Sequence, residues 1–234
     1  MSKAKPLNTG DKIKESLVFK DLPLTQKQKE FLDLSTHKDI KVLICTGPAG
    51  SSKTFISVLA ALKLLNEKKI SDIYYIRAAV ESADSKIGYL PGTLEDKISN
   101  YSLPCFDKLY EILPKSQADA LIKQGKVKPF AINYSRGMSW DCKALIIDEA
   151  QSMTSKEIVT MLTRIGKFTK AFVLADPMQS DLKANGAAPA ITKVKELLDT
   201  DEARRNGIYT FEFTEDDIMR SELVKFLVKE FKKL

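Results

Sequence analysis

The segment Lys41–Asn66, KVLICTGPAGSSKTFISVLAALKLLN, decides the fold class. It opens with Lys41–Thr46, a short apolar run rich in β-branched residues, which predicts a buried strand. It closes with Lys53–Asn66, which is apolar on nearly every side and predicts a buried helix. The glycine-containing loop between them resembles a phosphate-binding loop, in which backbone N–H groups at a helix N-terminus surround phosphate oxygens.

The chemistry of this loop predicts ATP and Mg²⁺ as its ligands. Lys53 reaches the β- and γ-phosphates in such a loop, and the hydroxyl of Thr54 faces Mg²⁺. A plain glycine turn before a helix is the alternative, but it does not require Lys-Thr at these positions. The expected nucleotide-binding residues of the loop are Gly47, Pro48, Ala49, Gly50, Ser51, Ser52, Lys53 and Thr54.

Ser52 departs from the usual pattern, which has glycine immediately before the lysine. A side chain there restricts the backbone angles and crowds the approach of a phosphate. We expect the loop to bind nucleotide and its turnover to suffer.

Two further apolar runs end in polar side chains. Ala144–Ile147 is followed by Asp148 and Glu149, and Ala171–Ala175 is followed by Asp176-Pro-Met-Gln179. Ligands of parallel α/β sheets bind at the carboxyl ends of the strands. We therefore expect Asp148 to hold Mg²⁺, Glu149 to act as the general base for a water, and Gln179 to contact the γ-phosphate or that water. The alternative for the second segment is an ordinary Asp-Pro turn.

Alternation of short buried strands with helices predicts one α/β domain with a mostly parallel sheet and helices on both faces. Further strands are expected at Ile73–Ile76 and Ile208–Phe213. Capping-box patterns predict helix starts at Thr93, Thr154 and Thr214, and the last helix has one apolar face. The domain is expected to span 21–234, after a loosely held basic arm at 1–20.

Composition excludes several classes of protein. The 234 residues are 44% hydrophobic, which is enough for a core and argues against disorder. No apolar run reaches the length of a membrane span, and the N-terminus lacks the apolar region of a secretory signal. Three cysteines and one histidine argue against a disulfide scaffold and a zinc site. We expect a cytoplasmic protein without a membrane partner.

The net charge of +6 is compatible with nucleic-acid binding without establishing it. The segment 115–143 carries six basic and two acidic residues, interleaved with Phe130, Tyr134 and Trp140. Cations for phosphates and aromatic rings for bases are how single strands are held. Alternatively, Phe130 and Trp140 belong to the core and the lysines form a solvated face. The candidate phosphate contacts in this segment are Lys126, Lys128 and Arg136.

Several motifs in a fixed order closely resemble the PhoH-like P-loop ATPases: GPAGSSKT, IRAAVESADSKIGYLPGTLEDKI, RGMSW, LIIDEAQ, LTRIG and ADPMQSDL. The resemblance runs from about Leu24 to the C-terminal helix. It implies a RecA-like core akin to superfamily 1 helicases, ATP hydrolysis, action on RNA or single-stranded DNA, and ring-shaped homo-oligomers, often hexamers. The departures are Ser51-Ser52 for the usual Thr-Gly and Ala175 for the usual glycine before Asp176. The short form looks like the version found in bacteriophages, and a phage-encoded protein of this kind is expected in the cytoplasm of a bacterial host cell.

The resemblance also assigns roles outside the loop. The adenine-reading glutamine of the family falls on Gln28, although Thr25 and Gln28 also fit a capping box that closes a helix start. Arg77, after the Ile73–Ile76 strand, resembles the helicase element that contacts the nucleic-acid backbone.

Hydrolysis in this class usually needs an arginine near the transferred phosphoryl group. Arg164 and Arg220 are the favoured candidates, and ordinary helix-surface salt bridges are the alternative for either. A neighbouring subunit of a ring is the expected source of such an arginine. Two rival functions stay open, a small-molecule kinase and a nucleotide-dependent regulatory module with little turnover.

Overall fold

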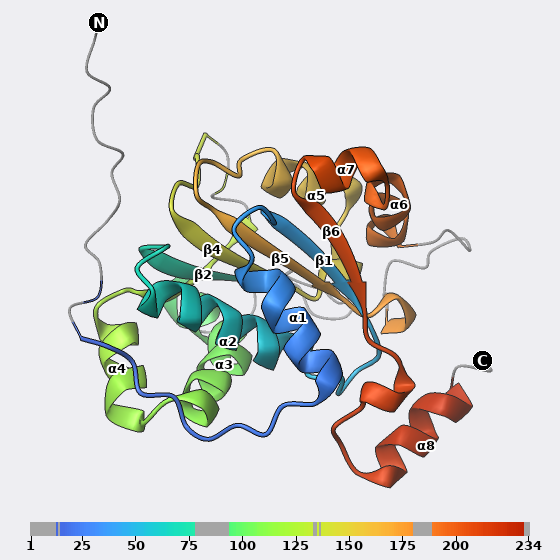
Figure 1. Cartoon of the computed structure of the whole chain (residues 1–234), viewed down its shortest axis with the longest axis horizontal. Coiled ribbons are helices and arrows are strands. Elements are labelled where there is room, and N and C mark those ends of the chain that lie inside the picture. Colours follow the sequence, from blue (N-terminus) through green and yellow to red (C-terminus); the bar gives the residue numbers. More distant parts are fainter. Residues whose placement is uncertain are drawn as a thin grey trace, which may run out of the picture.

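The protein is built on a six-stranded sheet whose strands are all parallel, in the order β3-β2-β4-β5-β1-β6 (Figure 1). The computed structural model describes residues 13, 15–77, 94–132, 135, 137–179 and 189–231. The predicted α/β class with a parallel sheet is confirmed. The strands are β1 (Val42–Thr46), β2 (Asp72–Arg77), β3 (Val127–Phe130), β4 (Lys143–Asp148), β5 (Lys170–Ala175) and β6 (Ile208–Glu212).

Five of these strands match the predicted apolar runs, and β3 was not predicted. Its sequence, Val-Lys-Pro-Phe, contains Pro129 and has no alternation that marks a strand. Proline cannot donate a hydrogen bond to a sheet ladder and is therefore confined to edges. β3 is the edge strand beside β2, which is why it tolerates Pro129.

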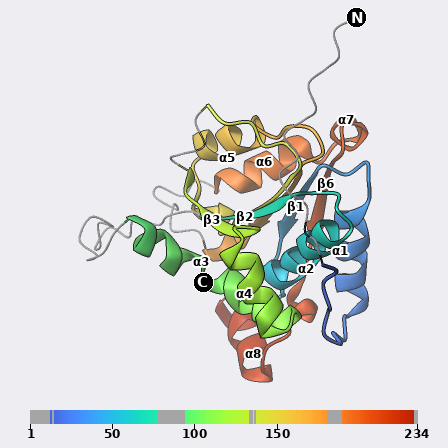
Figure 2. The same cartoon turned by 90° about the vertical axis from the view of Figure 1, so that its left-hand side faces the viewer.

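Helices cover both faces of the sheet (Figure 2). The larger hydrophobic core lies under α1 (Gln26–Thr36), α2 (Lys53–Asn66), α3 (Leu94–Ile112) and α4 (Lys115–Lys123). The opposite face packs against α5 (Ser155–Leu162) and α6 (Ala190–Leu198), and α7 (Asp201–Arg205) precedes β6. Helix α2 is buried along most of its length, as its sequence predicted.

The predicted helix starts had different outcomes. Thr154 caps α5 in a complete capping box with Glu157. Thr214 forms the same box with Asp217, but it begins only a 3-10 turn (Glu215–Asp217), and the terminal helix α8 (Glu222–Phe231) starts later. The predicted helix start at Thr214 is therefore wrong. The predicted start at Thr93 lies outside the described residues.

The apolar face of α8 does not contribute to either core. No residue of α8 is buried, and its exposed apolar side chains are Leu223, Phe226, Leu227 and Phe231.

The described part of the predicted N-terminal arm is held against the domain. Ile13 is buried in the larger core, and the N–H of Leu17 donates to Asn66 Oδ1 at 2.8 Å. The N–H of Val18 donates to Gln117 Oε1 at 2.8 Å. This described part is therefore not loosely held as expected, because apolar side chains in the otherwise polar segment pack against the core. None of the described helices is both long enough and apolar enough to cross a lipid bilayer.

Candidate functional site

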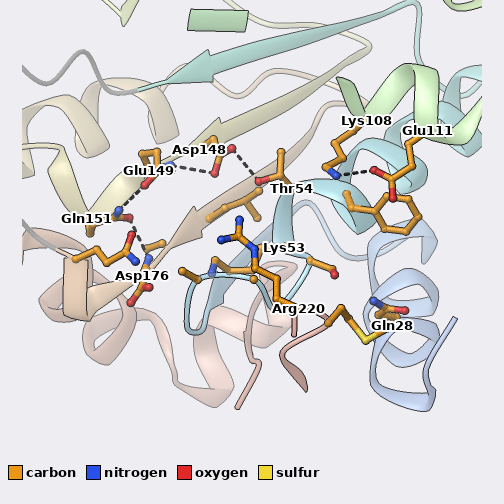
Figure 3. A pocket seen from close by; sticks show the side chains of 18 of the residues that line it. Gln28, Lys53, Thr54, Lys108, Glu111, Asp148, Glu149, Gln151, Asp176 and Arg220 are labelled. Carbon is orange, nitrogen blue, oxygen red and sulfur yellow. Dashed lines mark hydrogen bonds and ion pairs between the residues drawn. The ribbon is translucent and has the colours of Figure 1, made fainter. Parts of the chain in front are cut away.

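A cavity of about 660 Å³ lies at the carboxyl ends of β1, β4 and β5 (Figure 3). The loop after β1 and the start of α2 form its floor, and residues 148, 149, 151, 176 and 179 line one end. Gln28 of α1, together with Lys108 and Glu111 of α3, lines the other end, and Arg220 lies beside the loop. The parallel sheet thus brings the predicted phosphate loop and both acidic strand ends into one site.

Backbone conformation explains the composition of the loop. A side chain at Gly47 would place Cβ 2.7 Å from Cβ of Phe213, closer than side chains approach. Gly50 has φ +85°, and Ser52 has φ 64° and ψ 19°, both in the left-handed region. Because the left-handed region is strained for residues with a Cβ, Ser52 occupies a position that favours glycine.

Replacing Ser52 with glycine should relieve this strain. We expect a gain in the free energy of unfolding of up to about 1 kcal/mol, since glycine loses more entropy on folding and offsets part of the relief. ATP turnover should be preserved or raised. Urea unfolding and phosphate release measure the two effects. Lys68→Gly is the matched control, because Lys68 has φ 60° in the turn after α2, outside the cavity lining. A loss of nucleotide binding in Ser52→Gly alone would assign the serine a positive role.

The ammonium group of Lys53 is hydrogen-bonded to the backbone of the preceding loop. Its Nζ donates to the carbonyl oxygens of Gly47 at 2.7 Å and Pro48 at 2.9 Å. Burial lowers the pKa of Lys53, and the negative charge of Asp176 is the strongest of the effects that oppose this. The ammonium group therefore lies in a poorly solvated position, where a phosphate is a better partner than the two carbonyls.

Thr54 and Asp148 place two side-chain oxygens next to each other as potential metal ligands. The Thr54 hydroxyl donates to Asp148 Oδ2 at 2.9 Å, and the buried Tyr75 hydroxyl donates to the same oxygen at 2.7 Å. Burial, followed by the charge of Asp148, raises the pKa of Tyr75, which stays a protonated donor. Mg²⁺ prefers oxygen ligands and is bound in proteins by one or two side chains plus phosphates and water, so this pair fits it. No cluster of three or more His, Cys, Asp or Glu side chains suited to a metal occurs among the described residues.

Replacing Tyr75 with phenylalanine should weaken Mg²⁺ binding, because the carboxylate of Asp148 loses the hydroxyl that orients it. Losing such a partner costs about 10- to 100-fold in metal affinity. The measurement is the Mg²⁺ concentration that half-saturates binding of a non-hydrolysable ATP analogue. Tyr110→Phe is the control, since it removes a Tyr–Asp hydrogen bond of 2.7 Å, to Asp119, away from the cavity. Equal Mg²⁺ requirements in both variants would contradict the assignment.

Glu149 is held in an unusual conformation at the end of β4. Its φ of 55° is left-handed, which is strained for a side-chain-bearing residue and is characteristic of functional positions. Its Oε1 lies 3.5 Å from Nη2 of Arg77, and its Oε2 accepts a 2.5 Å bond from Nε2 of Gln151. Arg77, assigned from the sequence to nucleic acid, thus contacts the predicted base because β2 and β4 are paired.

Gln28 closes the start of α1 and also lines the cavity. Its Oε1 accepts from the N–H of Thr25 at 3.0 Å, and its own N–H donates to Thr25 Oγ1 at 3.2 Å, which completes the capping box. The side chain also lines the far end of the cavity, together with Leu22, Pro23 and Phe55. Gln28 can therefore cap the helix and still face the adenine ring of a nucleotide in the cavity.

The two favoured arginines lie in different places. Arg220 packs over the loop, where a Cβ at Gly50 would lie 3.0 Å from its Cδ, and the N–H of Met219 donates to the carbonyl of Gly50 at 3.0 Å. Arg164 does not line the cavity; its Nε donates to the Ser135 carbonyl at 2.7 Å and its Nη1 to the Thr160 carbonyl at 2.8 Å. Arg220 is therefore available to the chain's own loop, whereas Arg164 binds the C-terminal end of α5.

The predicted basic groove requires a correction. Lys126 is only 7% exposed and pairs with Asp72 at 3.5 Å, at the opposite end of β2 from the cavity. A buried lysine in an ion pair is not a surface contact for phosphates. Lys128 is half-buried, with its Nζ 4.8 Å from the ring centroid of Tyr74. Arg136 lies outside the described residues.

The aromatic residues of this segment belong largely to the core. Trp140 is buried, and its ring lies 4.6 Å from that of Tyr74 and 4.8 Å from that of Phe130, centroid to centroid. The core alternative is therefore the correct one for Phe130 and Trp140, and Tyr134 lies outside the described residues.

Sequence reasoning missed several residues of the site. Tyr75 reaches Asp148 only because β2 pairs with β4, and Gln151 accepts from the N–H of Asp176 only because β4 pairs with β5. Lys108 and Glu111, joined by a 2.5 Å ion pair, reach the cavity from α3. Gln151 alone had a sequence signal, since it follows Asp148-Glu149 closely in the LIIDEAQ motif.

Comparison with solved structures supports the fold. The large terminase of a thermophilic bacteriophage is similar with a TM-score of 0.53 at 18% identity, covering 91% of this chain and 50% of the terminase. A complex of that terminase with ADP gives a TM-score of 0.53 at 16% identity, covering 87% of this chain and 49% of the terminase.

Comparison of sequences identifies the family. The chain is 31% identical to PhoH-like proteins of Mycobacterium leprae and Bacillus subtilis over 209 residues, 89% of its length, and 29% identical to Protein PhoH of Escherichia coli over 202 residues, 86% of its length. It spans 58%, 63% and 55% of these relatives. Residues 22–232 match the family described as PhoH-like protein. Both the ordered motifs and the phosphate loop on a parallel sheet agree with this match, and the chain belongs to the PhoH-like protein family.

Proposed function

We propose that the protein binds ATP with Mg²⁺ and hydrolyses it. The observation that carries the proposal is the meeting of Lys53, the Thr54–Asp148 pair and Glu149 at one cavity. A loop that only turned the chain would need none of these side chains at its edge. Membership of the PhoH-like family and the likeness of the fold to an ADP-binding terminase support the same conclusion.

Each side chain has a role that follows from its position. Lys53 exchanges the carbonyls of Gly47 and Pro48 for oxygens of the β- and γ-phosphates, while N–H groups at the start of α2 bind the β-phosphate. Thr54 and Asp148 would hold Mg²⁺, which would neutralise charge on the phosphates. Gln28 reads the adenine amine and ring nitrogen beside Phe55.

The hydrolytic step uses the opposite end of the cavity. Glu149 accepts a proton from the attacking water, and Gln179 hydrogen-bonds that water or the γ-phosphate. Arg220, over Gly50, neutralises charge on the transferred phosphoryl group from within the same chain. In an assembled ring, Arg164 of an adjacent subunit would be the alternative source of this charge.

Action on nucleic acid and assembly into a hexameric ring complete the proposed function, in the cytoplasm of the cell. The net positive charge and the contact of Arg77 with Glu149 support an effect of RNA or single-stranded DNA on hydrolysis. A phosphate that pairs with Arg77 would compete with Glu149 for the guanidinium group. A regulatory module with little turnover is the second candidate, favoured by the left-handed backbone of Ser52.

The decisive experiment measures phosphate release by the purified chain with and without Mg²⁺ and with single-stranded RNA or DNA, alongside mass photometry. We expect Mg²⁺-dependent ATP hydrolysis, stimulation by a single strand, and a hexameric mass. Tight binding of ATP without release of phosphate under any condition favours the regulatory module. Absence of ATP binding contradicts the proposal.

Replacing Arg77 with glutamine tests the nucleic-acid contact. Binding of a single strand should weaken with rising salt, and the variant should flatten the log–log slope by about 0.7, the value for one phosphate contact to a single strand. Fluorescence anisotropy with labelled RNA and DNA at several salt concentrations measures the slope. Arg205→Gln, which alters an exposed arginine at the end of α7, is the control. Salt-independent binding, or an unchanged slope in Arg77→Gln, would place the contact elsewhere.

A further inference from the structure

Gln151 connects the two polar strand ends of the cavity. It lies in the 3-10 turn (Ala150–Ser152) after β4 and is only 2% exposed. Its Nε2 donates to Oε2 of Glu149 at 2.5 Å, and its Oε1 accepts from the N–H of Asp176 at 2.9 Å (Figure 3). One buried side chain thus spans from the predicted base, the first residue after β4, to the first residue after β5.

The chemistry of the two partners fixes the orientation of this amide. A carboxylate can only accept a hydrogen bond and a backbone N–H can only donate one, so the amide nitrogen must face Glu149 and the oxygen must face Asp176. The N–H of Gln179 in turn donates to the carbonyl of Asp176 at 3.0 Å. Gln151 therefore joins Glu149 to the turn that carries Gln179.

The other restraints on Glu149 are weaker. Its contact with Arg77 is 3.5 Å long, and both side chains are half-buried, so water competes for it. The left-handed backbone of Glu149 takes its side chain off the regular direction of the strand. The bond from the buried Gln151 is shorter than the contact with Arg77 and better shielded from water.

We propose that Gln151 is a positioning residue for ATP hydrolysis, which holds the carboxylate of Glu149 toward the attacking water and in register with the turn of Gln179. The inference rests on the proposed ATPase activity. It assigns Gln151 no contact with the nucleotide, and its effect passes through Glu149.

The test begins with Gln151→Met, which keeps the length of the side chain and removes both hydrogen bonds. We expect kcat to fall by about 10- to 100-fold, the cost of misplacing a reacting group by up to an ångström. Binding of a non-hydrolysable ATP analogue should be unchanged. Gln117→Met is the matched control, because Gln117 also bridges two groups, the Val18 N–H and the Ser16 carbonyl, away from the cavity. Its kcat should equal that of the unaltered protein.

A double-mutant cycle separates positioning of Glu149 from other effects. In the Glu149→Gln background, Gln151→Met should cause no further loss of kcat, since a residue that acts through another has no effect once that residue is replaced. The same fold-loss in both backgrounds, an unchanged kcat in the single variant, or lost analogue binding would each overturn the proposal.

An NMR measurement separates failure of this inference from failure of the proposed function. The side-chain NH₂ signals of Gln151 are assigned by their loss in Gln151→Met. They should shift in Glu149→Ala and keep their positions in Glu67→Ala, which alters an exposed glutamate outside the cavity. Absence of turnover in the unaltered protein would refute the ATPase. Unshifted Gln151 signals in Glu149→Ala would refute the contact on which the positioning role depends.

Discussion

Lys53→Ala is expected to abolish ATP turnover and to weaken ATP binding by about 100-fold. Truncating one partner of a buried, charged hydrogen bond costs roughly 3 kcal/mol, and every 1.4 kcal/mol is tenfold in affinity. The half-buried Lys53 ammonium donates to two loop carbonyls, and alanine at this position removes the cation that would face the β- and γ-phosphates. Calorimetric titration with ATP and a phosphate-release assay measure the two losses.

Lys63→Ala is the matched control for this variant. Lys63 lies in the last turn of the same helix α2, outside the cavity lining, so the variant loses the same side chain from the same helix without touching the loop. It should leave binding and turnover unchanged. If Lys53→Ala bound ATP as tightly as the unaltered protein, the loop would not be the phosphate site.

Glu149→Gln is expected to retain ATP binding and lose hydrolysis. Removing a general base typically lowers the rate by about 10² to 10⁴, whereas the amide keeps the size of the side chain and an oxygen that accepts from Gln151. The substitution also removes the ion pair between Glu149 and Arg77. This pair is half-exposed and contributes little to stability. Single-turnover phosphate release and analogue binding, measured together, distinguish the two effects.

Glu67→Gln serves as the control for Glu149→Gln. Glu67 is exposed and forms an ion pair of 2.6 Å with Lys69, so the variant loses a glutamate charge and an ion pair away from the cavity. Its turnover should be unchanged. Hydrolysis by Glu149→Gln at the rate of the unaltered protein would mean that another group activates the water.

Much of the fold could be predicted because its signals are local. The apolar runs of β1, β4 and β5 are short and bounded, and parallel strands buried on both faces read as continuous hydrophobic segments. The loop 47–54 requires a particular backbone, and a buried helix follows it directly. The edge strand β3 carried no such signal, because Pro129 and Lys128 are tolerated where only one side is paired.

The basic segment shows where local reasoning fails. Basic residues and aromatic rings interleave along 115–143, which fits both a nucleic-acid groove and a strand with its neighbours. Burial decided the outcome: Trp140 fills the core between the sheet and α5, and Lys126 finds Asp72 at the amino edge of the sheet. A charged residue enters such a position only when a partner of opposite charge is there, and the partner lies 54 residues away along the chain.

By itself, the sequence determined the phosphate loop, the two acidic strand ends, the α/β class and the likeness to the family, because each depends on residues adjacent in the chain. Only the tertiary structure decided which distant side chains meet them. Tyr75 reaches Asp148, Arg77 contacts Glu149, Gln151 accepts from the N–H of Asp176, and Arg220 covers Gly50. These contacts depend on the order of strands in the sheet and on the path of the chain after β6. Apolar periodicity specifies which face of an element is buried, but not which element lies next to it.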